Sequence, residues 1–465
     1  MKNFFKKNIC CIGAGYVGGP TMSVIALNCP EYRIDVVDIN NERIKNWNSD
    51  DLSKLPVFEP GLDKIVEHCR GENLFFSSNI KECISKADII FISVNTPTKK
   101  KGLGAHYASD LSWIEASARQ IAKFARNHTI VVEKSTLPVK TAETIKNILD
   151  SCKEENINKN CSDVTFSIIS NPEFLAEGSA VNDLLNPDRV LIGGEEEDSI
   201  NVISDIYKHW VDSEKIITTN LWSSELSKLV ANAFLAQRIS SINSISALCE
   251  STGANVNEVA NAVGSDKRIG NKFLNSGPGF GGSCFKKDIL NLVYICRFYQ
   301  LNEVAEYWEQ VIKINSWQQN RISHIVIKNL FGTLSNKKLA LFGFSFKANT
   351  NDTRESPTIN ISKNLFKEGA KLSFYDPKVN SSQILNDLDG IVHNDDVLIY
   401  DDPSKAANGA DAIVILTEWD EFKNLDWPYI FRVMRKPAWV FDTRICLDKE
   451  LLRKIGFKVW ILGNS

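Results

Sequence analysis

The stretch Asn8-Ile9-Cys10-Cys11-Ile12-Gly13-Ala14-Gly15-Tyr16-Val17-Gly18 decides the fold of this chain. An apolar strand runs directly into a G-x-G-x-x-G fingerprint and a helical pattern follows, as a dinucleotide-binding βαβ unit requires. The glycines allow a tight turn and let the backbone approach a pyrophosphate, which binds at the helix N-terminus where free N–H groups attract an anion. We therefore predict that Gly13, Ala14, Gly15, Tyr16, Val17 and Gly18 hold a dinucleotide.

The end of the next predicted strand indicates which dinucleotide this is. Asp38 stands twenty residues after Gly18, where a carboxylate accepts hydrogen bonds from ribose hydroxyls and repels a 2′-phosphate. The sequence therefore favours NAD over NADP. The alternative, a tight turn followed by a solvated acid, does not explain why strand, turn, helix and acid stand in register. Arg43 is open: it could stack on an adenine, contact a phosphate or lie in solvent.

Short apolar runs alternate with helical patterns through the first half of the chain, at residues 8–13, 33–38, 87–94, 129–135 and 165–170. This alternation is typical of a parallel sheet with crossover helices. Residues 222–250 contain neither Pro nor Gly and predict one long helix, and apolar runs at 337–344, 371–377, 411–417 and 438–442 predict a second sheet. We expect an α/β fold with two Rossmann-like doubly wound domains, residues 1–220 and 330–465, joined by a central long-helix domain, residues 221–329.

Composition excludes several classes of protein. The 54 Lys and Arg are balanced by 57 Asp and Glu, so no nucleic-acid partner is expected. None of the eleven cysteines forms a C-x-x-C pair and the six histidines lie far apart, so we expect neither a metal site nor a disulfide framework. The longest apolar runs have strand length, and the chain starts without a leader pattern, so we expect a cytoplasmic protein with no membrane contact.

One cysteine has the setting of a nucleophile, in Gly281-Gly282-Ser283-Cys284-Phe285-Lys286-Lys287-Asp288. The pattern predicts a helix start with Ser283 as N-cap and the thiol in the first turn, where the helix dipole and two lysines favour the reactive thiolate. Asp288 lies four residues later on the same face and can accept a proton from the thiol or from water. The alternative is a buried, inert thiol, as we expect for Cys10 and Cys296.

Two further clusters bear on this chemistry. Lys228 and Asn232 are four apart on the predicted long helix and offer a cation and an amide to a developing oxyanion, although alone they would read as surface residues. Residues 171–178, NPEFLAEG, follow a strand and carry two glutamates, at the edge where α/β sheets bind ligands. Solvated turn glutamates are the alternative. Residues 94–98 and 133–136 also follow strands.

The chain resembles the UDP-glucose/GDP-mannose dehydrogenase family over nearly its whole length. The likeness rests on motifs that occur in order: GAGYVGGP, FISVNTPT, EKSTLPV, NPEFLAEG, NPDRVLIGG, WSSELSKLVANAFLAQ, RIGNKFL, GFGGSCF, GFSFK, DTRESP and TEWDEF. The resemblance implies a two-step, four-electron oxidation of UDP-glucose to UDP-glucuronate with two NAD consumed. A thiohemiacetal and then a thioester on Cys284 would be the intermediates.

The resemblance also implies roles residue by residue. The catalytic set is Cys284, Asp288, Lys228, Asn232, Glu173 and Thr136. The resemblance does not assign the role of general base to one of Glu173 and Asp288. NAD would contact the fingerprint, Asp38, Arg43, Val94, Asn95, Thr96, Pro97, Thr98, Ser135, Thr136, Glu177 and Arg354. The sugar nucleotide would contact Glu173, Phe174, Leu175, Ala176, Glu177, Lys228, Asn232, Arg268, Asn275, Ser276, Gly277, Pro278, Gly279, Phe280, Gly281, Phe346, Lys347 and Arg444, with UDP-glucose held partly by residues 330–465.

Arg268 would reach the substrate of a neighbouring subunit, which implies a homo-oligomer, either a dimer or a hexamer built as a trimer of dimers. The loop before the cysteine departs from the family, with Asn275 where animal members commonly carry lysine. Three alternatives stay open: the same chemistry on another nucleotide sugar such as GDP-mannose, a plain two-electron dehydrogenase, and a non-catalytic NAD-binding redox scaffold. The intact Lys228, Asn232, Cys284 and Asp288 set argues against the last.

Overall fold

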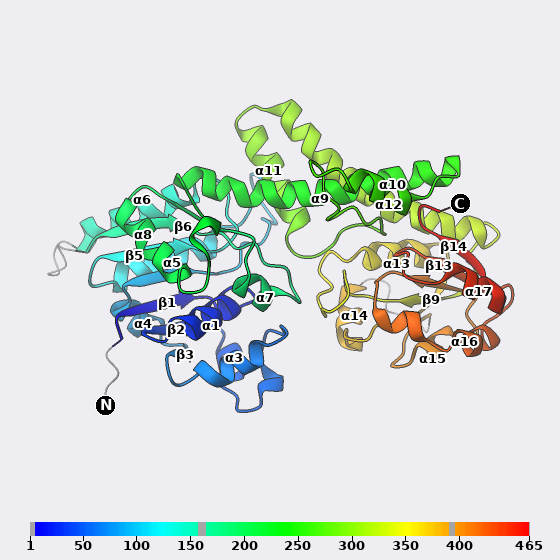
Figure 1. Ribbon diagram of the computed structural model, residues 1–465, viewed down its shortest axis with the longest axis horizontal. Coiled ribbons are helices and arrows are strands. Elements are labelled where there is room, and N and C mark those ends of the chain that lie inside the picture. The colour runs from blue at the N-terminus through cyan, green and yellow to red at the C-terminus, as the bar shows by residue number, and fades with distance from the viewer. Residues whose placement is uncertain (1–4, 157–163, 390–395, 465) are drawn as a thin grey trace. The chain divides into compact units, whose positions relative to one another are not determined.

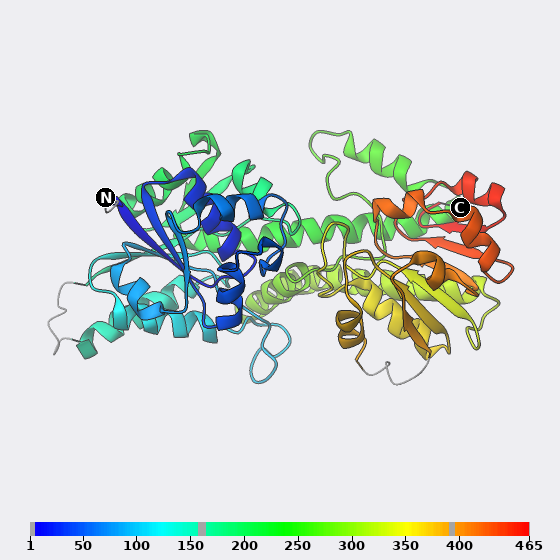
Figure 2. The same cartoon turned by 90° about the horizontal axis from the view of Figure 1, so that it is seen from below.

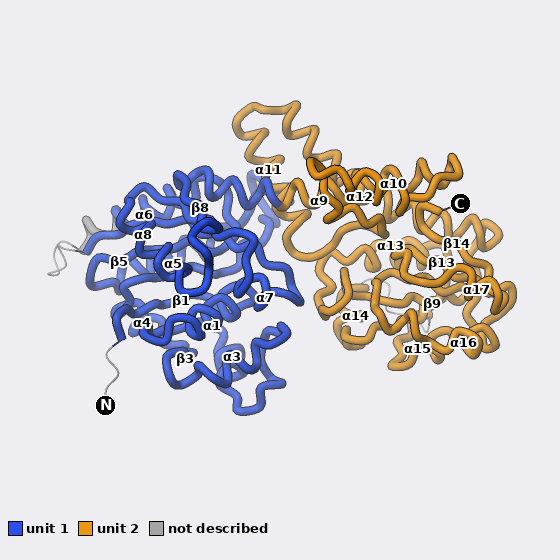
Figure 3. The backbone as a smooth tube through the Cα atoms, viewed as in Figure 1, with its two compact units in different colours: residues 1–231 blue, residues 232–465 orange. Residues whose placement is uncertain are grey.

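The computed structural model describes residues 5–156, 164–389 and 396–464 (Figure 1), and Figure 2 shows the same ribbon from below. The chain divides into unit 1, Met1–Ala231, and unit 2, Asn232–Ser465 (Figure 3). The α/β class, the two doubly wound sheets and the long central helix are confirmed, whereas the three-domain boundaries at 220 and 329 stay a prediction. No helix in the described ranges combines the length and apolarity needed to cross a membrane.

Unit 1 is built on an eight-stranded sheet of order β3-β2-β1-β4-β5-β6-β7-β8, in which β6 and β7 run antiparallel and all other neighbours run parallel. The strands are β1 (Lys7–Ile12), β2 (Tyr32–Val37), β3 (Leu74–Ser77), β4 (Ile89–Ile92), β5 (Thr129–Glu133), β6 (Phe166–Ser170), β7 (Val190–Gly194) and β8 (Ile216–Thr219). The helices are α1 (Gly18–Asn28), α2 (Asn41–Trp47), α3 (Leu62–Cys69), α4 (Ile80–Lys86), α5 (Ser112–Phe124), α6 (Thr141–Asn156), α7 (Ala180–Leu185) and α8 (Glu197–Tyr207), with 3-10 turns at Leu52–Lys54 and Ser213–Lys215.

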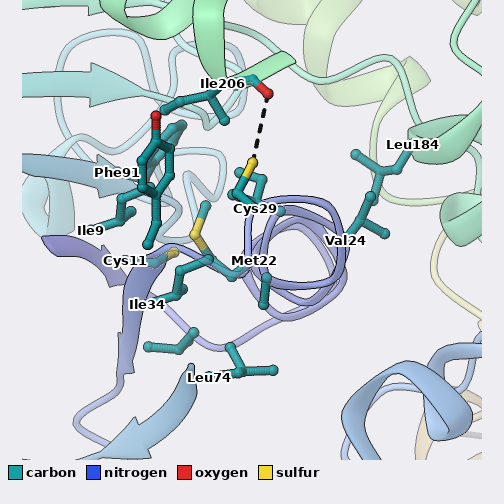
Figure 4. Close-up of a cluster of buried hydrophobic side chains, with 14 of the residues drawn as sticks. Ile9, Cys11, Met22, Val24, Cys29, Ile34, Leu74, Phe91, Leu184 and Ile206 are labelled. Atoms are coloured by element: carbon teal, nitrogen blue, oxygen red, sulfur yellow. Dashed lines mark hydrogen bonds between the residues drawn. The ribbon is translucent and has the colours of Figure 1, made fainter. Parts of the chain in front are cut away.

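Helices cover both faces of this sheet because its inner strands are apolar on both sides. Ile9 and Cys11 of β1 pack in a buried cluster with residues of α1, α3 and α8 (Figure 4). Cys10 and Ile12 point to the opposite face and pack with residues of α4, α5 and α6. The side chains of this continuous apolar run therefore alternate between two hydrophobic cores, one on each face of the sheet.

The long helix α9 (Leu221–Thr252) begins in unit 1 and continues into unit 2. It is followed by α10 (Val256–Gly264), α11 (Phe285–Phe298) and α12 (Asn302–Asn329). The second sheet has strands β9 (Lys338–Phe342), β10 (Lys371–Tyr375), β11 (Val397–Ile399), β12 (Ala412–Ile415), β13 (Trp439–Asp442) and β14 (Lys458–Ile461), all parallel in the order β11-β10-β9-β12-β13-β14. Its helices are α13 (Pro357–Lys367), α14 (Ser381–Asp387), α15 (Pro403–Ala407), α16 (Trp427–Val433) and α17 (Lys449–Ile455), with a 3-10 turn at Asp420–Asn424.

The turn after the first strand is built in the same way in both sheets. Gly13 follows β1 with φ +110°, and a Cβ there would lie 2.4 Å from the carbonyl oxygen of Ser93, just after β4. Gly343 follows β9 with φ +92°, and a Cβ there would lie 2.4 Å from Cβ of Thr417, just after β12. Each turn therefore excludes a side chain through its backbone conformation and through its neighbour.

We predict that Gly343→Ala destabilises the protein more than Gly409→Ala, its matched control. Gly409 also has a positive φ, +68°, but a Cβ there would meet nothing within 4 Å. The control should therefore lose about 1 kcal/mol from backbone strain alone. Gly343→Ala should lose at least about 2 kcal/mol more because the new methyl overlaps Thr417. Urea unfolding followed by circular dichroism measures both, and equal losses would contradict the packing argument.

Candidate active site

The fingerprint turn of unit 1 has room for a pyrophosphate where the prediction needs it. A Cβ on Gly18 would lie 2.0 Å from the carbonyl oxygen of Gly13, so internal packing requires this glycine. A Cβ on Gly15 would meet nothing within 4 Å, which leaves open space beside the turn. The next residues, Tyr16 and Val17, lead into α1, whose N-terminus carries no side-chain cap. These features fit a dinucleotide phosphate at the start of α1.

Asp38 lies at the end of β2 and is tied to the fingerprint. Its carboxylate accepts hydrogen bonds from the backbone N–H groups of Ala14, at 3.0 Å, and Asn40, at 2.8 Å. Arg43, whose role the sequence left open, forms an ion pair with Asp38 at 2.9 Å. The acid that the sequence assigns to the ribose is thus held in a fixed orientation beside the turn.

The loops after β4 and β5 are joined to each other by hydrogen bonds. The hydroxyl of Ser135 donates to the carbonyl oxygen of Val94 at 2.7 Å, and that of Thr96 donates to the carbonyl oxygen of Thr136 at 3.1 Å. The predicted cofactor segment 94–98, which includes Asn95, Pro97 and Thr98, therefore lies beside the predicted cofactor and catalytic residues of the β5 loop.

A buried ion pair follows β6. Lys228 Nζ on α9 lies 3.3 Å from Glu173 Oε1, and both side chains are buried. The other oxygen of Glu173 accepts the N–H of Leu175 at 2.7 Å, and the Phe174 ring lies 5.3 Å from Lys228 Nζ. Two predicted catalytic residues, distant in sequence, are therefore in contact.

Two carboxylates, those of Asp183 and Glu59, hold the backbone of the rest of the loop after β6. The N–H of Ala176 donates to Asp183 at 2.9 Å. The N–H of Gly178, next to the predicted ligand residue Glu177, donates to Glu59 at 2.8 Å, and that of Ala180 donates to the same carboxylate at 2.9 Å. Glu59 is buried and was not singled out by sequence. Glu59 is 119 residues from Gly178 in the sequence, so no local sequence pattern predicts their contact.

In unit 2, Cys284 lies directly before α11 and is half-buried. The expectation that Ser283 caps this helix is wrong, because Cys284 itself occupies the N-cap position and no side chain caps the helix. Ser283 instead places its hydroxyl 3.4 Å from Sγ of Cys284. The thiol therefore precedes the first helical turn by one residue, close to the free N–H groups of the helix start.

Asp288 and Asn232 are in contact within the same unit. The Nδ2 group of Asn232, on α9, donates to Oδ2 of Asp288 at 2.6 Å, and Lys287 Nζ lies 3.8 Å from Oδ1. Asp288 is buried and its N–H donates to the carbonyl of Cys284 at 2.9 Å, so Asp288 lies one helical turn after the N-cap cysteine. Lys228 and Asn232 stand one turn apart on α9, as their spacing indicated.

The glycine-rich loop before the cysteine is held by polar side chains of α9 and α12. Asn243 accepts the N–H of Gly277 at 2.8 Å, and Asn315 both accepts from and donates to the backbone of Phe280. Ser276 is buried and its hydroxyl has no hydrogen-bond partner among the described residues, whereas Asn275 is exposed. Pro278 and Gly279 are buried in the same loop.

Several predicted substrate residues meet at this loop. A Cβ on Gly277 would lie 3.4 Å from Arg444 Nη1, and Arg444 donates to the carbonyl oxygen of Phe346 at 2.9 Å. A Cβ on Gly281 would lie 2.8 Å from Cβ of Phe346, and Lys347 follows with its ammonium 5.7 Å from the Phe346 ring.

Of the two further predicted ligand residues Arg354 and Arg268, only Arg354 contacts this loop. The carbonyl of Arg354 accepts the N–H of Gly282 at 2.8 Å, and its guanidinium pairs with Asp352 at 2.7 Å. Arg268 is not brought to the loop: its side chain is 89% exposed and pairs with Asp266.

The sequence analysis noted residues 133–136 at a strand end but did not predict that Glu133 and Lys134 are buried. Lys134 is buried and donates to Asn171 at 3.0 Å and to the Tyr207 hydroxyl at 3.1 Å. Glu133 is buried on the opposite side of the strand, beside Glu225. The sequence shows two consecutive charged residues after the apolar run TIVV. Such a pattern is equally typical of a solvated strand end, so it does not predict buried charges. Within the described ranges, no three His, Cys, Asp or Glu side chains gather as a metal site would require.

A doubly wound sheet with an intact fingerprint and an acid after its second strand defines an NAD-binding domain, the type of domain that NAD-dependent oxidoreductases carry. The comparison with known families is more specific. Residues 7–211, 222–317 and 340–449 match the NAD binding domain, the central domain and the UDP binding domain of the UDP-glucose/GDP-mannose dehydrogenase family. The chain belongs to this family.

Individual relatives agree with this assignment. A UDP-glucose 6-dehydrogenase of Bos taurus is 56% identical over 99% of this chain and 93% of its own length, and one of Caenorhabditis elegans is 55% identical over 98% and 95%. The structure of a UDP-glucose dehydrogenase from the archaeon Pyrobaculum islandicum matches with a TM-score of 0.82 and 28% identity, covering 98% of this chain and 99% of that one.

We predict that Cys284 reacts with iodoacetamide before the other eight described cysteines. Seven of these are buried, and only Cys284 and Cys446 are partly accessible. Burial and the adjacent Asp442 raise the pKa of the Cys446 thiol far above its usual range, so little thiolate is present there at pH 7.5. Peptide mass spectrometry of the native protein should show labelling of Cys284 at least about tenfold faster than that of Cys446. Faster labelling of Cys446 would contradict this reading.

Proposed function

We propose that this chain oxidises UDP-glucose to UDP-glucuronate with two equivalents of NAD, through intermediates bound to Cys284. The observation that carries the proposal is the match to UDP-glucose 6-dehydrogenases, 54–56% identical over at least 98% of the chain. A family domain that binds UDP matches residues 340–449, which supports a uridine nucleotide as the carrier of the sugar.

Cys284 is the group that allows one protein to perform two successive oxidations. When bound, NAD supplies the hydride acceptor for each of them. After the alcohol at C6 has become an aldehyde, the thiolate adds to the carbonyl carbon and forms a thiohemiacetal. Loss of a second hydride leaves a thioester, and water then breaks the C–S bond to release the carboxylate and the thiol. Two hydrides, and thus four electrons, leave each sugar.

Lys228 and Asn232 are suited to stabilise the oxyanion that forms on the thiohemiacetal oxygen. One hydrogen of the Asn232 amide is used on Asp288, which orients the amide and leaves the second hydrogen for the substrate. The ammonium of Lys228 is similarly oriented by Glu173. Donors that are fixed in advance need no reorganisation when charge develops on the substrate.

Asp288 and Glu173 are the carboxylates that can move protons. Asp288 follows Cys284 by one helical turn and is suited to take the thiol proton, while Glu173 and Thr136 are suited to position the attacking water. Both carboxylates accept from a fixed donor, so each is held in the orientation in which it can receive a proton from the reacting groups.

The loop of residues 275–281 with Phe346, Lys347 and Arg444 is suited to bind the sugar nucleotide. The guanidinium of Arg444 lies beside Gly277 and Lys347 adds a second cation, which suits a pyrophosphate. The buried hydroxyl of Ser276 lacks a partner within the described residues, so a ligand atom can satisfy it.

Assembly and location belong to the same proposal. The exposed side chain of Arg268 suits a contact with the substrate of a neighbouring subunit, in a dimer or a hexamer of three dimers. A cytoplasmic location is supported by the nine described cysteines, all of which are free thiols.

The deciding experiment counts NADH at completion, with excess NAD and a limiting, known amount of UDP-glucose. We expect about two NADH per sugar and an acidic product, because the cysteine-bound aldehyde is oxidised before release. One NADH per sugar would indicate a plain alcohol dehydrogenase. Reaction with GDP-mannose but not with UDP-glucose would keep the chemistry and overturn the substrate.

Matched cysteine variants identify the nucleophile in the same assay. Cys284→Ser should fail to complete turnover, since a serine hydroxyl is far less ionised than a thiol at neutral pH, and intact-mass measurement would reveal a trapped ester. Cys446→Ser should turn over normally. Normal steady-state rates in Cys284→Ser would rule out the covalent mechanism.

Asp38→Ser should relax the preference for NAD over NADP. Loss of the carboxylate removes a hydrogen bond to the ribose and the repulsion of a 2′-phosphate. The ratio of kcat/KM for the two cofactors should fall by at least about tenfold, as expected for one charge-assisted hydrogen bond. Asp35→Ser is the control, because Asp35 lies within the preceding strand β2 and pairs with Arg33. Unchanged discrimination in Asp38→Ser would mean that Asp38 does not contact the ribose.

A further inference from the structure

Two interacting carboxyl groups, those of Glu133 and Glu225, are buried in the interior of unit 1. Glu133 is the last residue of β5, and its side chain is 1% exposed. Neither of its oxygens has a hydrogen-bond donor among the described residues. Glu225, on α9, is its charged neighbour and is also buried. Two negative charges that interact in a buried environment repel each other strongly, so we expect the pair to hold a proton.

The backbone around the pair decides where that proton resides. Glu225 accepts the N–H of Lys140 at 2.7 Å on one oxygen and the N–H of Ala142 at 2.9 Å on the other, at the N-terminus of α6. Backbone N–H groups and the helix dipole both favour a negative charge on Glu225. Glu133 has no such donors, so it is the member that carries the proton.

The pKa shifts agree with this assignment. Burial raises the pKa of the Glu133 carboxyl well above its usual range, and the neighbouring Glu225 raises it further. Burial also raises the pKa of Glu225, but the N–H groups of Ala142 and Lys140 and a hydrogen bond with Glu133 act in the opposite direction.

The other charged groups nearby are engaged elsewhere. Lys134 points to Asn171 and Tyr207, on the other side of the strand, and Lys228 pairs with Glu173. On α6, Glu143 is exposed and lies 4.0 Å from the equally exposed Lys140 ammonium, and Lys146 pairs with Glu195. The strands beside Glu133 place Ile92 and Ser170 opposite it, and neither titrates. Among the residues that the structure describes, Glu133 and Glu225 are therefore the two groups that we expect to share the proton.

We propose that protonated Glu133 donates a hydrogen bond to ionised Glu225, and that this pair positions the loop holding Thr136 against the helix holding Lys228. The pair joins three elements: β5 through Glu133, the start of α6 through Lys140 and Ala142, and α9 through Glu225, three residues before Lys228. Neither glutamate touches the substrate, so both are positioning residues. Their effect on catalysis rests on the function proposed above for Thr136 and Lys228.

The direction of the pH dependence follows from the raised pKa. Above the ordinary pKa of a glutamate, about 4.3, the native state keeps a proton that the unfolded chain releases. The stability contributed by the pair is therefore fully present at low pH and decreases as pH rises toward the native pKa. Glu133→Gln removes this dependence, because its amide still donates to Glu225 but does not titrate.

The first test compares melting temperatures of Glu133→Gln, the parent and the exposed control Glu143→Gln between pH 5 and pH 8. The melting temperature of Glu133→Gln relative to the parent should rise by about 5 °C or more over this range. The control should follow the parent throughout. A constant difference between Glu133→Gln and the parent at all pH values would overturn the shared proton.

The second test compares kcat of Glu133→Gln and Glu133→Leu at pH 7, at a temperature where melting curves show both to be folded. Gln keeps the donor and should retain kcat within about twofold. Leu has similar size but cannot donate to Glu225, which then keeps only its two backbone N–H donors, and Leu should lower kcat at least about tenfold. Equal activity of the Leu and Gln variants would overturn the positioning role.

The two tests separate this inference from the proposed function. If the parent does not oxidise UDP-glucose, the function fails, and with it the positioning role, while the melting temperatures still decide whether the proton is shared. If the parent oxidises UDP-glucose but the melting difference is constant with pH, only the present inference fails.

Discussion

The turn that leaves the first strand of each sheet is the constraint on which the rest of the structure depends. The N–H of Gly13 donates to Val37, and that of Gly343 donates to Tyr375, both at 2.8 Å. Each glycine also passes so close to the segment after the fourth strand that no Cβ fits. In each sheet the first strand therefore ends between the second strand and the fourth strand. The strand order reverses at this point, and doubly wound sheets bind their ligands there.

Buried charges give the strand ends of unit 1 their fixed positions. Lys134 is satisfied by Asn171 and Tyr207, and Glu59 accepts two backbone N–H groups around Gly178. A buried charge costs several kcal/mol unless hydrogen bonds replace its water, so displacement of any of these loops would leave a charge without partners. The loops that carry the predicted catalytic and cofactor residues are thus held by side chains that need never touch a ligand.

The sequence predicted the long helix and the inner strands other than β7, but not the sheet edges. The strands that it did not predict include β3, β8, β11 and β14, which are the outermost strands of the two sheets. Edge strands are short and only half-covered, so Ile216–Thr219 and Val397–Ile399 lack the continuous apolar run by which inner strands are recognised. Motif spacing predicted Asp38, Cys284 and Asp288, whereas the contacts of Glu59 and Glu225 depend on segments more than 80 residues away.

The same topology is used differently in the two sheets. Asp376 follows β10 as Asp38 follows β2, and it likewise accepts backbone N–H groups of the first turn, those of Phe344 and Ser345. In unit 1 that turn exposes Gly15 to open space, whereas in unit 2 the turn carries Phe344 and Ser345, both fully buried. Trp419 also donates to Asp376. The position at which unit 1 can admit a pyrophosphate is therefore filled in unit 2 by the protein's own side chains. We therefore expect a nucleotide bound by unit 2 to use another surface, such as the loop of residues 275–281 proposed above, where Arg444 lies beside Gly277 and the Ser276 hydroxyl has no hydrogen-bond partner among the described residues.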